Sequence, residues 1–159
     1  MKKTKYVLIS LLCIVTLLGF TGCGKNKTSI SADEFCSIME DKGFLTTDST
    51  AQYATSNDIS ESYIAISSNY AYQIEFIVLD SDSAAQSMFS TNKSIFESEK
   101  NSSGSNANTF TELANYSKYT LLANGKYKVV SRIDNTLIFV NAKSDYKEEI
   151  NSILEELGY

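Results

Sequence analysis

Apolar and polar positions along this chain change period several times, and each change predicts a secondary-structure element. Between residues 31 and 43, apolar residues recur three and four positions apart, which predicts an amphipathic helix. Ser31 begins it in a Ser-x-x-Glu capping box, and Gly43 supplies the stop at its C-terminal end. The same period predicts a second helix over 83–100 and a third over 146–157.

Alternation of apolar and polar residues predicts strands between these helices. Two strands, Tyr63–Ser67 and Tyr72–Leu79, lie between the first and second helices. The polar segment over 45–62 predicts a short strand or an irregular segment, followed by a loop. After the second helix, residues 101–108 are rich in Asn, Ser and Gly and predict a loop. From Phe110 onward the pattern predicts sheet.

The last part of the chain carries a clear hairpin signal. Asn124-Gly125 separates the predicted strands Tyr119–Ala123 and Lys126–Ile133, and both turn residues tolerate positive φ. A further turn leads to the strand Thr136–Ala142, which completes a predicted three-stranded meander.

Helices with one apolar face, together with antiparallel hairpins, predict an α+β fold. We expect a two-layer sandwich, with a mainly antiparallel sheet of about five or six strands and helices on one face. The segment from Phe35 to Phe44 matches the segment from Ile150 to Tyr159 at its Ser, Ile, Glu and Gly positions. The match leaves open a duplicated helix–strand–strand unit or the convergence of two glycine-capped helices.

The first 23 residues follow a different pattern. Three lysines stand within the first five residues, an apolar run follows to Phe20, and the segment ends on Phe20-Thr21-Gly22-Cys23. This is the order of a secretory signal. The apolar run of about 15 residues is shorter than the roughly 20 that a spanning helix needs.

This ending resembles the lipobox of bacterial lipoproteins, although Phe20 stands where that family prefers Leu. The resemblance implies cleavage before Cys23, a diacylglycerol and fatty-acyl (palmitate) group on Cys23, and anchorage at the outer face of the cell membrane. An uncleaved N-terminal anchor and an ordinary secretory cut that leaves Cys23 as a thiol are the alternatives.

The predicted organisation follows from this ending. Residues 1–22 are the signal peptide, 23–30 the lipidated cysteine and a polar tether, and 31–159 a single α+β domain. The composition, rich in Ser, Asn, Tyr and Lys, resembles that of small surface lipoproteins of low-GC Gram-positive bacteria.

The net charge of the chain limits the kinds of partner that it can bind. The formal charge of −5 becomes about −8 once the three signal-peptide lysines are removed, which argues against nucleic acid as a partner. Membrane association would therefore depend on the lipid.

Of the three cysteines, Cys13 would leave with the signal peptide and Cys23 would carry the lipid. Cys36 is then single, so the domain has no internal disulfide, and we expect Cys36 to be half-buried.

Several catalytic arrangements are missing from the sequence. The chain has no His and no Trp, which excludes Ser-His-Asp and Cys-His catalysis and nearly all zinc sites. We therefore expect no enzyme, no cofactor apart from the covalent lipid, and no metal site.

Adjacent carboxylates are the remaining catalytic candidates. These pairs are Asp80 with Asp82 and Glu155 with Glu156. Neighbours in sequence do not establish the separation that a hydrolase needs between its two acids. The segment from Asp80 to Ser83 also lacks the glycine and the distal Glu of a calcium loop. We expect Ser81 or Asp82 to cap the second helix, and Ser144 or Asp145 to cap the third.

Tyrosines gather around the predicted hairpins. They give contact area with a polar tip, which suits both strands and recognition surfaces. One hypothesis is that they line an exposed sheet face or rim that binds a partner. The other is that they are ordinary half-buried strand residues. The residues concerned are Tyr63, Tyr70, Tyr72, Tyr116, Tyr119 and Tyr127.

The sequence therefore favours a membrane-anchored surface lipoprotein that acts as a non-enzymatic binding or interaction module. An envelope protein is the expected partner. The alternatives are an envelope hydrolase with paired carboxylates and a lipoprotein that binds a small ligand or solute.

Overall fold

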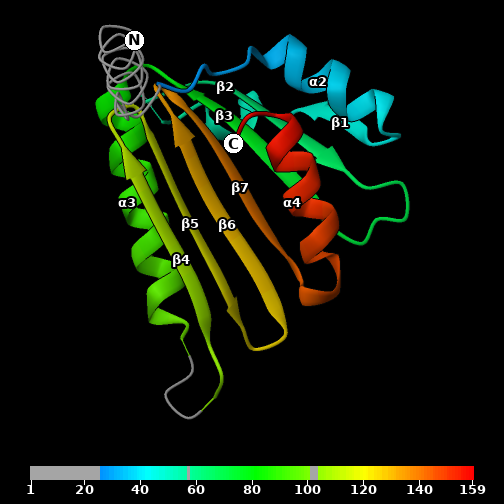
Figure 1. The fold of residues 1–159 in the computed structure, drawn as a ribbon. Helices are drawn as coiled ribbons and strands as arrows, with labels where there is room; N and C mark the ends of the chain where they lie inside the picture. Colours follow the sequence, from blue (N-terminus) through cyan, green and yellow to red (C-terminus); the bar gives the residue numbers. More distant parts are fainter. Residues whose placement is uncertain (1–25, 57, 101–103) are drawn as a thin grey trace, which may run out of the picture.

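A seven-stranded antiparallel sheet forms the centre of the computed structural model, which describes residues 26–56, 58–100 and 104–159 (Figure 1). The strand order is β1-β2-β3-β7-β6-β5-β4. The α+β class with an antiparallel sheet is confirmed, with seven strands instead of five or six. The strands are β1 (Leu45–Asp48), β2 (Ile59–Ile66), β3 (Gln73–Leu79), β4 (Ala107–Leu113), β5 (Tyr116–Ala123), β6 (Lys126–Ile133) and β7 (Thr136–Lys143).

Three helices and two 3₁₀ turns complete the described chain. These elements are α2 (Ala32–Asp41), η1 (Thr50–Tyr53), α3 (Asp82–Ser98), η2 (Ser144–Tyr146) and α4 (Lys147–Glu156). Helix α3 connects two meanders, β1-β2-β3 and β4-β5-β6-β7, which are joined where β3 pairs with β7. The meander predicted at the end of the chain is thus present and has one more strand, β4.

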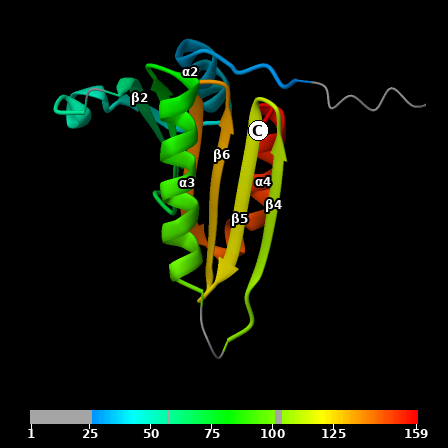
Figure 2. The ribbon, with the colours of Figure 1, turned by 90° about the vertical axis from the view of Figure 1, so that its left-hand side faces the viewer.

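The sheet is apolar on both faces, and helices cover both. In β3, Ile74 and Phe76 belong to the core under α2 and α4, whereas Ile77 and Leu79 belong to the core under α3. Figures 1 and 2 show α3 and α4 on opposite sides of the sheet. The expectation that all helices share one face is therefore corrected. Central strands with apolar residues at consecutive positions need cover on both faces.

Helices α2 and α4 end with the same backbone geometry. Gly43 and Gly158 have φ of 81° and 85°. The amides of the next residues, Phe44 and Tyr159, donate to carbonyls five residues earlier, at 3.0 and 2.8 Å. This is the glycine stop that the sequence predicted. Duplication of a whole unit stays a prediction.

Side-chain caps begin two of the helices. Ser31 Oγ and Ser81 Oγ each accept the amide N–H three residues later, at 3.2 Å, which confirms the predicted caps of α2 and α3. The predicted cap of the last helix is wrong. Ser144 and Asp145 lie within η2, and α4 begins after that turn without a side-chain cap.

The segment before α2 packs against the domain. The amide of Lys27 donates to Asn115 Oδ1 at 3.1 Å, and Asn115 Nδ2 donates back to the carbonyl of Lys27 at 2.7 Å. Lys27 Nζ donates to the carbonyl of Gly158 at 2.7 Å and lies 3.9 Å from the ring centroid of Tyr116. The tether predicted over 23–30 is therefore fixed from Lys27 onward. Cys23 lies outside the described residues.

In the parts of the chain that the structure describes, no helix is both long enough and apolar enough to cross a bilayer.

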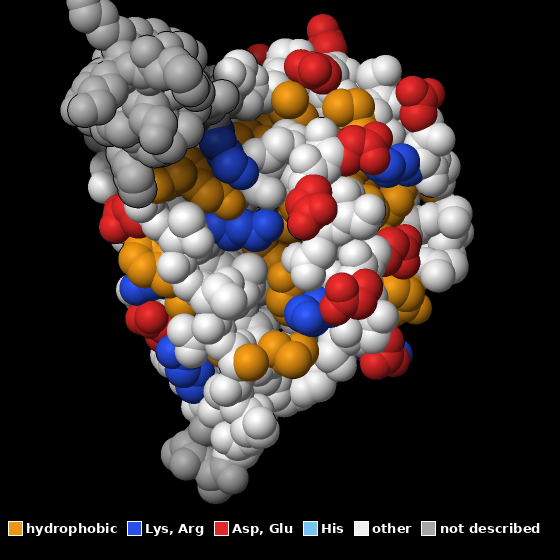
Figure 3. All heavy atoms as spheres, in the orientation of Figure 1, with side chains coloured by type: hydrophobic (Ala, Val, Ile, Leu, Met, Phe, Trp, Pro, Cys, Tyr) orange, Lys and Arg blue, Asp and Glu red, His pale blue; other side chains and the backbone are white. Residues whose placement is uncertain are grey.

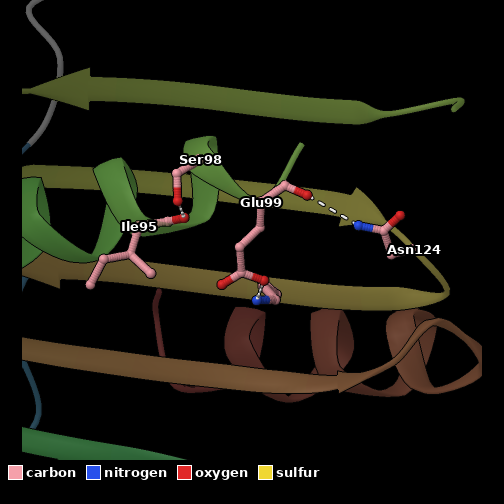
Figure 4. A network of polar contacts seen from close by, with 5 residues as sticks. Ile95, Ser98, Glu99 and Asn124 are labelled. Atoms are coloured by element: carbon pink, nitrogen blue, oxygen red, sulfur yellow. Dashed lines mark hydrogen bonds and ion pairs between the residues drawn. The ribbon is translucent and has the colours of Figure 1, made fainter. Parts of the chain in front are cut away.

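Polar contacts hold the C-terminal end of α3 over β6 (Figure 4). Glu99 forms an ion pair with Lys128, whose side chain is only 8% exposed. The carbonyl of Glu99 accepts from Asn124 Nδ2 at 3.1 Å, and within the helix Ser98 Oγ donates to the carbonyl of Ile95 at 2.7 Å. These contacts fix α3 to β6 and to the β5–β6 turn.

We predict that Glu99→Gln lowers the free energy of unfolding by about 1–2 kcal/mol, because it leaves the buried ammonium of Lys128 without its partner charge. The control is Glu97→Gln, which removes the 3.3 Å ion pair with Lys93, whose side chain is 27% exposed, and should cost at most about 0.5 kcal/mol. Urea unfolding of the full chain measures both. Equal losses would show that burial of Lys128 is unimportant.

Candidate functional site

The six tyrosines singled out from the sequence fall into different environments. Four of them, Tyr72, Tyr116, Tyr119 and Tyr127, are at most 6% exposed. The exposed-surface hypothesis is therefore corrected for these four, because their side chains belong to the two buried cores on either side of the sheet. Tyr63 is half-buried against the core under α2, and Tyr70 is 74% exposed.

Two of the buried tyrosines connect the sheet to α4. Tyr72 Oη donates to Glu149 Oε1 at 2.8 Å, and Tyr127 Oη donates to Asn151 Oδ1 at 2.6 Å. Burial raises the pKa of both phenols, and the carboxylate of Glu149 raises that of Tyr72 further. Both hydroxyls therefore stay protonated and serve as structural donors.

We predict that Tyr72→Ser lowers the free energy of unfolding by about 3 kcal/mol, because it removes a buried ring and its hydrogen bond. Tyr70→Ser is the matched control two residues away, and its effect should stay within about 0.5 kcal/mol because Tyr70 is exposed. Chemical unfolding compares the two variants. A loss at Tyr70 as large as that at Tyr72 would contradict the assignment of Tyr72 to the core.

The adjacent carboxylates do not come together in a pocket. Asp80 and Asp82 are exposed, and Asp80 accepts a hydrogen bond from Ser60 Oγ. Glu155 and Glu156 are also exposed, and Glu156 pairs with Lys42. Within residues 26–56, 58–100 and 104–159, no group of three or more His, Cys, Asp or Glu is placed to hold a metal ion.

Cys36 is half-buried with a free thiol, as expected from the sequence. Burial raises the pKa of this thiol, and the nearby carboxylate of Glu40 raises it further. The thiolate form is therefore disfavoured.

One hollow of the described structure lies beside α3. A helix is about 10 Å wide and strands are about 4.8 Å apart, so one helix covers only two or three of the seven strands. Next to α3 the sheet forms the floor of a cavity of about 410 Å³, which we call the α3 cleft. Its floor consists of Ile77, Leu79, Leu137 and Phe139, with Glu75 beside them. Its walls are Ala84, Ser87, Met88, Thr91 and Asn92 of α3, and Tyr53, Ser56 and Asp58 of the β1–β2 connection.

Turn η1 holds the outer wall of this cleft in place. Ser49 Oγ and Ser62 Oγ lie 2.8 Å apart, both side chains are buried, and the amide of Ser62 donates to Thr50 Oγ1 at 2.9 Å. These contacts fasten the β1–β2 connection to β2 and place Tyr53 at the cleft. The sequence predicted a short strand or an irregular segment followed by a loop over 45–62, so this wall was missed.

The cleft combines an apolar floor with an acidic rim. Asp58 and Glu75 are its charged residues, and no Lys or Arg is among the described residues that line it. Burial and the charge of Glu75 raise the pKa of the Tyr53 hydroxyl, which stays protonated at neutral pH. Glu75 Oε1 accepts from Gln73 Nε2 at 2.9 Å. The cleft therefore suits a molecule with an apolar body and a cationic or hydrogen-bond-donating end.

A second hollow, of about 550 Å³, adjoins the cleft. It shares Glu75 and Phe139 with the cleft, so the two hollows follow one another over β3 and β7. Tyr70 lies at its exposed edge, with φ of 57° in the β2–β3 turn. Tyr70 is thus the one of the six predicted tyrosines that is exposed beside a hollow, and its role in binding stays a prediction.

Comparison with known proteins adds little to this picture. The chain matches no protein-family model and no curated protein. Among solved structures, it is similar to a GTP binding regulator from Thermotoga maritima at 14% sequence identity, covering 78% of this chain and 84% of that one, with a TM-score of 0.46.

Proposed function

We propose that this protein is a lipid-anchored binding module at the outer face of the cell membrane, with the α3 cleft as its ligand site. The observation that carries the proposal is the cleft, whose volume of about 410 Å³ lies within the usual range for small-ligand sites, roughly 300–1,000 Å³. Its apolar floor and acidic rim favour a small amphipathic ligand that is neutral or cationic over an anion of the same shape.

The contacts of Lys27 support a defined orientation on the membrane. If Cys23 carries the lipid, only three residues lie between it and Lys27, so the Cα atoms of the two residues are at most about 14 Å apart. The end of the domain that holds Asn115 and Gly158 would then face the bilayer. The cleft begins near that end, because Leu79 of its floor exchanges hydrogen bonds with Asn135 in the adjacent β6–β7 turn.

The surface charge fits attachment through a lipid. Acidic side chains are more numerous over α2 and α4 than over β4 and β5 (Figure 3). An acidic surface is repelled by anionic headgroups, so the domain would stay at the membrane through its acyl chains and not through its own charge.

We predict that Cys23→Ala abolishes fatty-acid labelling of the full-length protein and releases it from membranes, because the substituted residue has no thiol to acylate. The matched control is Cys36→Ala, which should keep both properties. Metabolic labelling with a palmitate analogue and membrane fractionation measure the effect. Persistent labelling of the Cys23 variant would overturn the anchor without affecting the proposal for the cleft.

We predict that the full chain binds phenethylammonium more tightly than phenylacetate, which carries the same ring and the opposite charge. Ser87→Trp places an indole in the cleft and should weaken phenethylammonium binding by at least about tenfold, whereas Gln86→Trp on the exposed side of α3 should leave it unchanged. Changing Asp58 and Glu75 together to their amides should reduce the preference for the cation by about three- to tenfold.

Ligand-observed NMR with the full chain in detergent measures these affinities. Equal binding of the anion, or equal effects of the two tryptophan variants, would contradict the proposal for the cleft.

A further inference from the structure

Strand β4 is an edge strand without the usual protection against pairing. All seven of its residues are exposed, and its register with β5 runs without a bulge from Ala107 to Leu113. Natural edge strands are commonly shortened, bulged, or interrupted by Pro or Lys, and β4 has none of these features. Phe110 and Leu113 are 48% and 41% exposed.

The two edges of the sheet differ. The opposite edge strand, β1, has only four residues and leads directly into η1, which folds back over β2. In Figure 2, β4 runs along the margin of the sheet, and among the described strands it pairs with β5 alone. Its outer backbone donors and acceptors are therefore available over a length that another strand can match.

We propose that β4 pairs antiparallel with β4 of a second copy of this chain, centred on Phe110. In this register Phe110 lies opposite its own copy, Asn108 opposite Glu112, Thr109 opposite Thr111, and Ala107 opposite Leu113. Such a contact is a two-fold interface in which the same residues serve both copies.

The sequence of β4 is complementary to itself in this register. Thr–Thr and apolar pairs across strands are favourable, and like charges placed directly opposite one another are not. The single charged residue of β4, Glu112, faces the neutral Asn108 of the other copy. Centring the pair on Glu112 would instead place two carboxylates together. Charge thus disfavours the register centred on Glu112, and the register centred on Phe110 pairs all seven residues of β4.

Two contacts with α3 fix the position of the Phe110 ring. The ring stacks on Phe89 of α3 with centroids 6.3 Å apart, and Lys93 Nζ lies 4.9 Å from its centroid. Pairing would bring two such Phe89–Phe110 stacks side by side on the α3 face and continue the sheet from one copy into the next.

This interface is separate from the α3 cleft. The cleft lies over β3 and β7, and β6 and β5 stand between β7 and β4. A variant can therefore lose dimerisation without losing ligand binding, and the reverse. If the protein is anchored to the membrane as proposed, its copies share one surface, which raises their effective concentration for pairing.

The first test introduces Phe110→Cys into the full-length protein in its membranes. Facing residues of an antiparallel pair have Cα atoms about 4.5–5.5 Å apart, which a disulfide can bridge. Copper-catalysed oxidation should convert most of the variant to a dimer on a non-reducing gel. The unsubstituted chain controls for its own cysteines, and Thr47→Cys on β1 is the matched edge control. Neither of these two chains should form a disulfide-linked dimer on the gel.

The second test places charge at Asn108 in the Phe110→Cys background. Asn108→Lys should increase the dimer yield, because lysine faces Glu112 of the other copy, whereas Asn108→Glu should decrease it. With two symmetric pairs per dimer, each change should shift the dimerisation constant by about three- to tenfold. Sedimentation of the unsubstituted full chain in detergent should also show a concentration-dependent dimer.

Each contrary outcome overturns self-pairing. These outcomes are a Phe110→Cys variant that cross-links no more than Thr47→Cys, two Asn108 variants that change in the same direction, or an unsubstituted chain that stays monomeric at every concentration. A heavier cross-linked product that contains a different protein, without the self-dimer, would assign the edge to a heterologous strand instead.

Discussion

The structure depends on a sheet whose central strands are apolar on both faces. Both faces must be shielded from water, and the described part of the chain has three helices that can cover them. Helices α2 and α4 share one face, which leaves α3 alone on the other. A single helix covers too few strands, and the β1–β2 connection covers a further part of this face. The α3 cleft is the space left between these two covers.

Local sequence patterns predicted those parts of the fold that depend on residues close together in the chain. The turn at Asn124-Gly125 has the positive φ values, 53° and 71°, that its sequence indicated. Strand β4 was predicted only from Phe110 onward. Both of its faces are exposed, so no apolar alternation marks its beginning at Ala107. The face occupied by α3 was also missed, although the apolar Ile77 beside Phe76 already indicated a strand covered on both sides.

The candidate site could be predicted far less well than the fold. Tyr70 and Tyr72 stand two residues apart in a similar local sequence, yet one is 74% exposed and the other 6%. Tertiary packing, which local composition does not encode, makes this difference. The cleft draws on segments far apart in the chain, and Met88 has the spacing of an ordinary core residue. No contiguous motif marks these positions, so only the fold could bring them together.

A fragment screen followed by NMR on the full chain, with labelled Ile, Leu and Met methyl groups, tests the account most directly. The account predicts that bound fragments shift the methyl signals of Ile77, Leu79, Met88 and Leu137 and leave those of Ile74 and Ile138, on the opposite face of the sheet, unchanged. Shifts concentrated on the opposite face, or no reproducible binding at the cleft, would contradict the central claim that the space beside α3 is the ligand site.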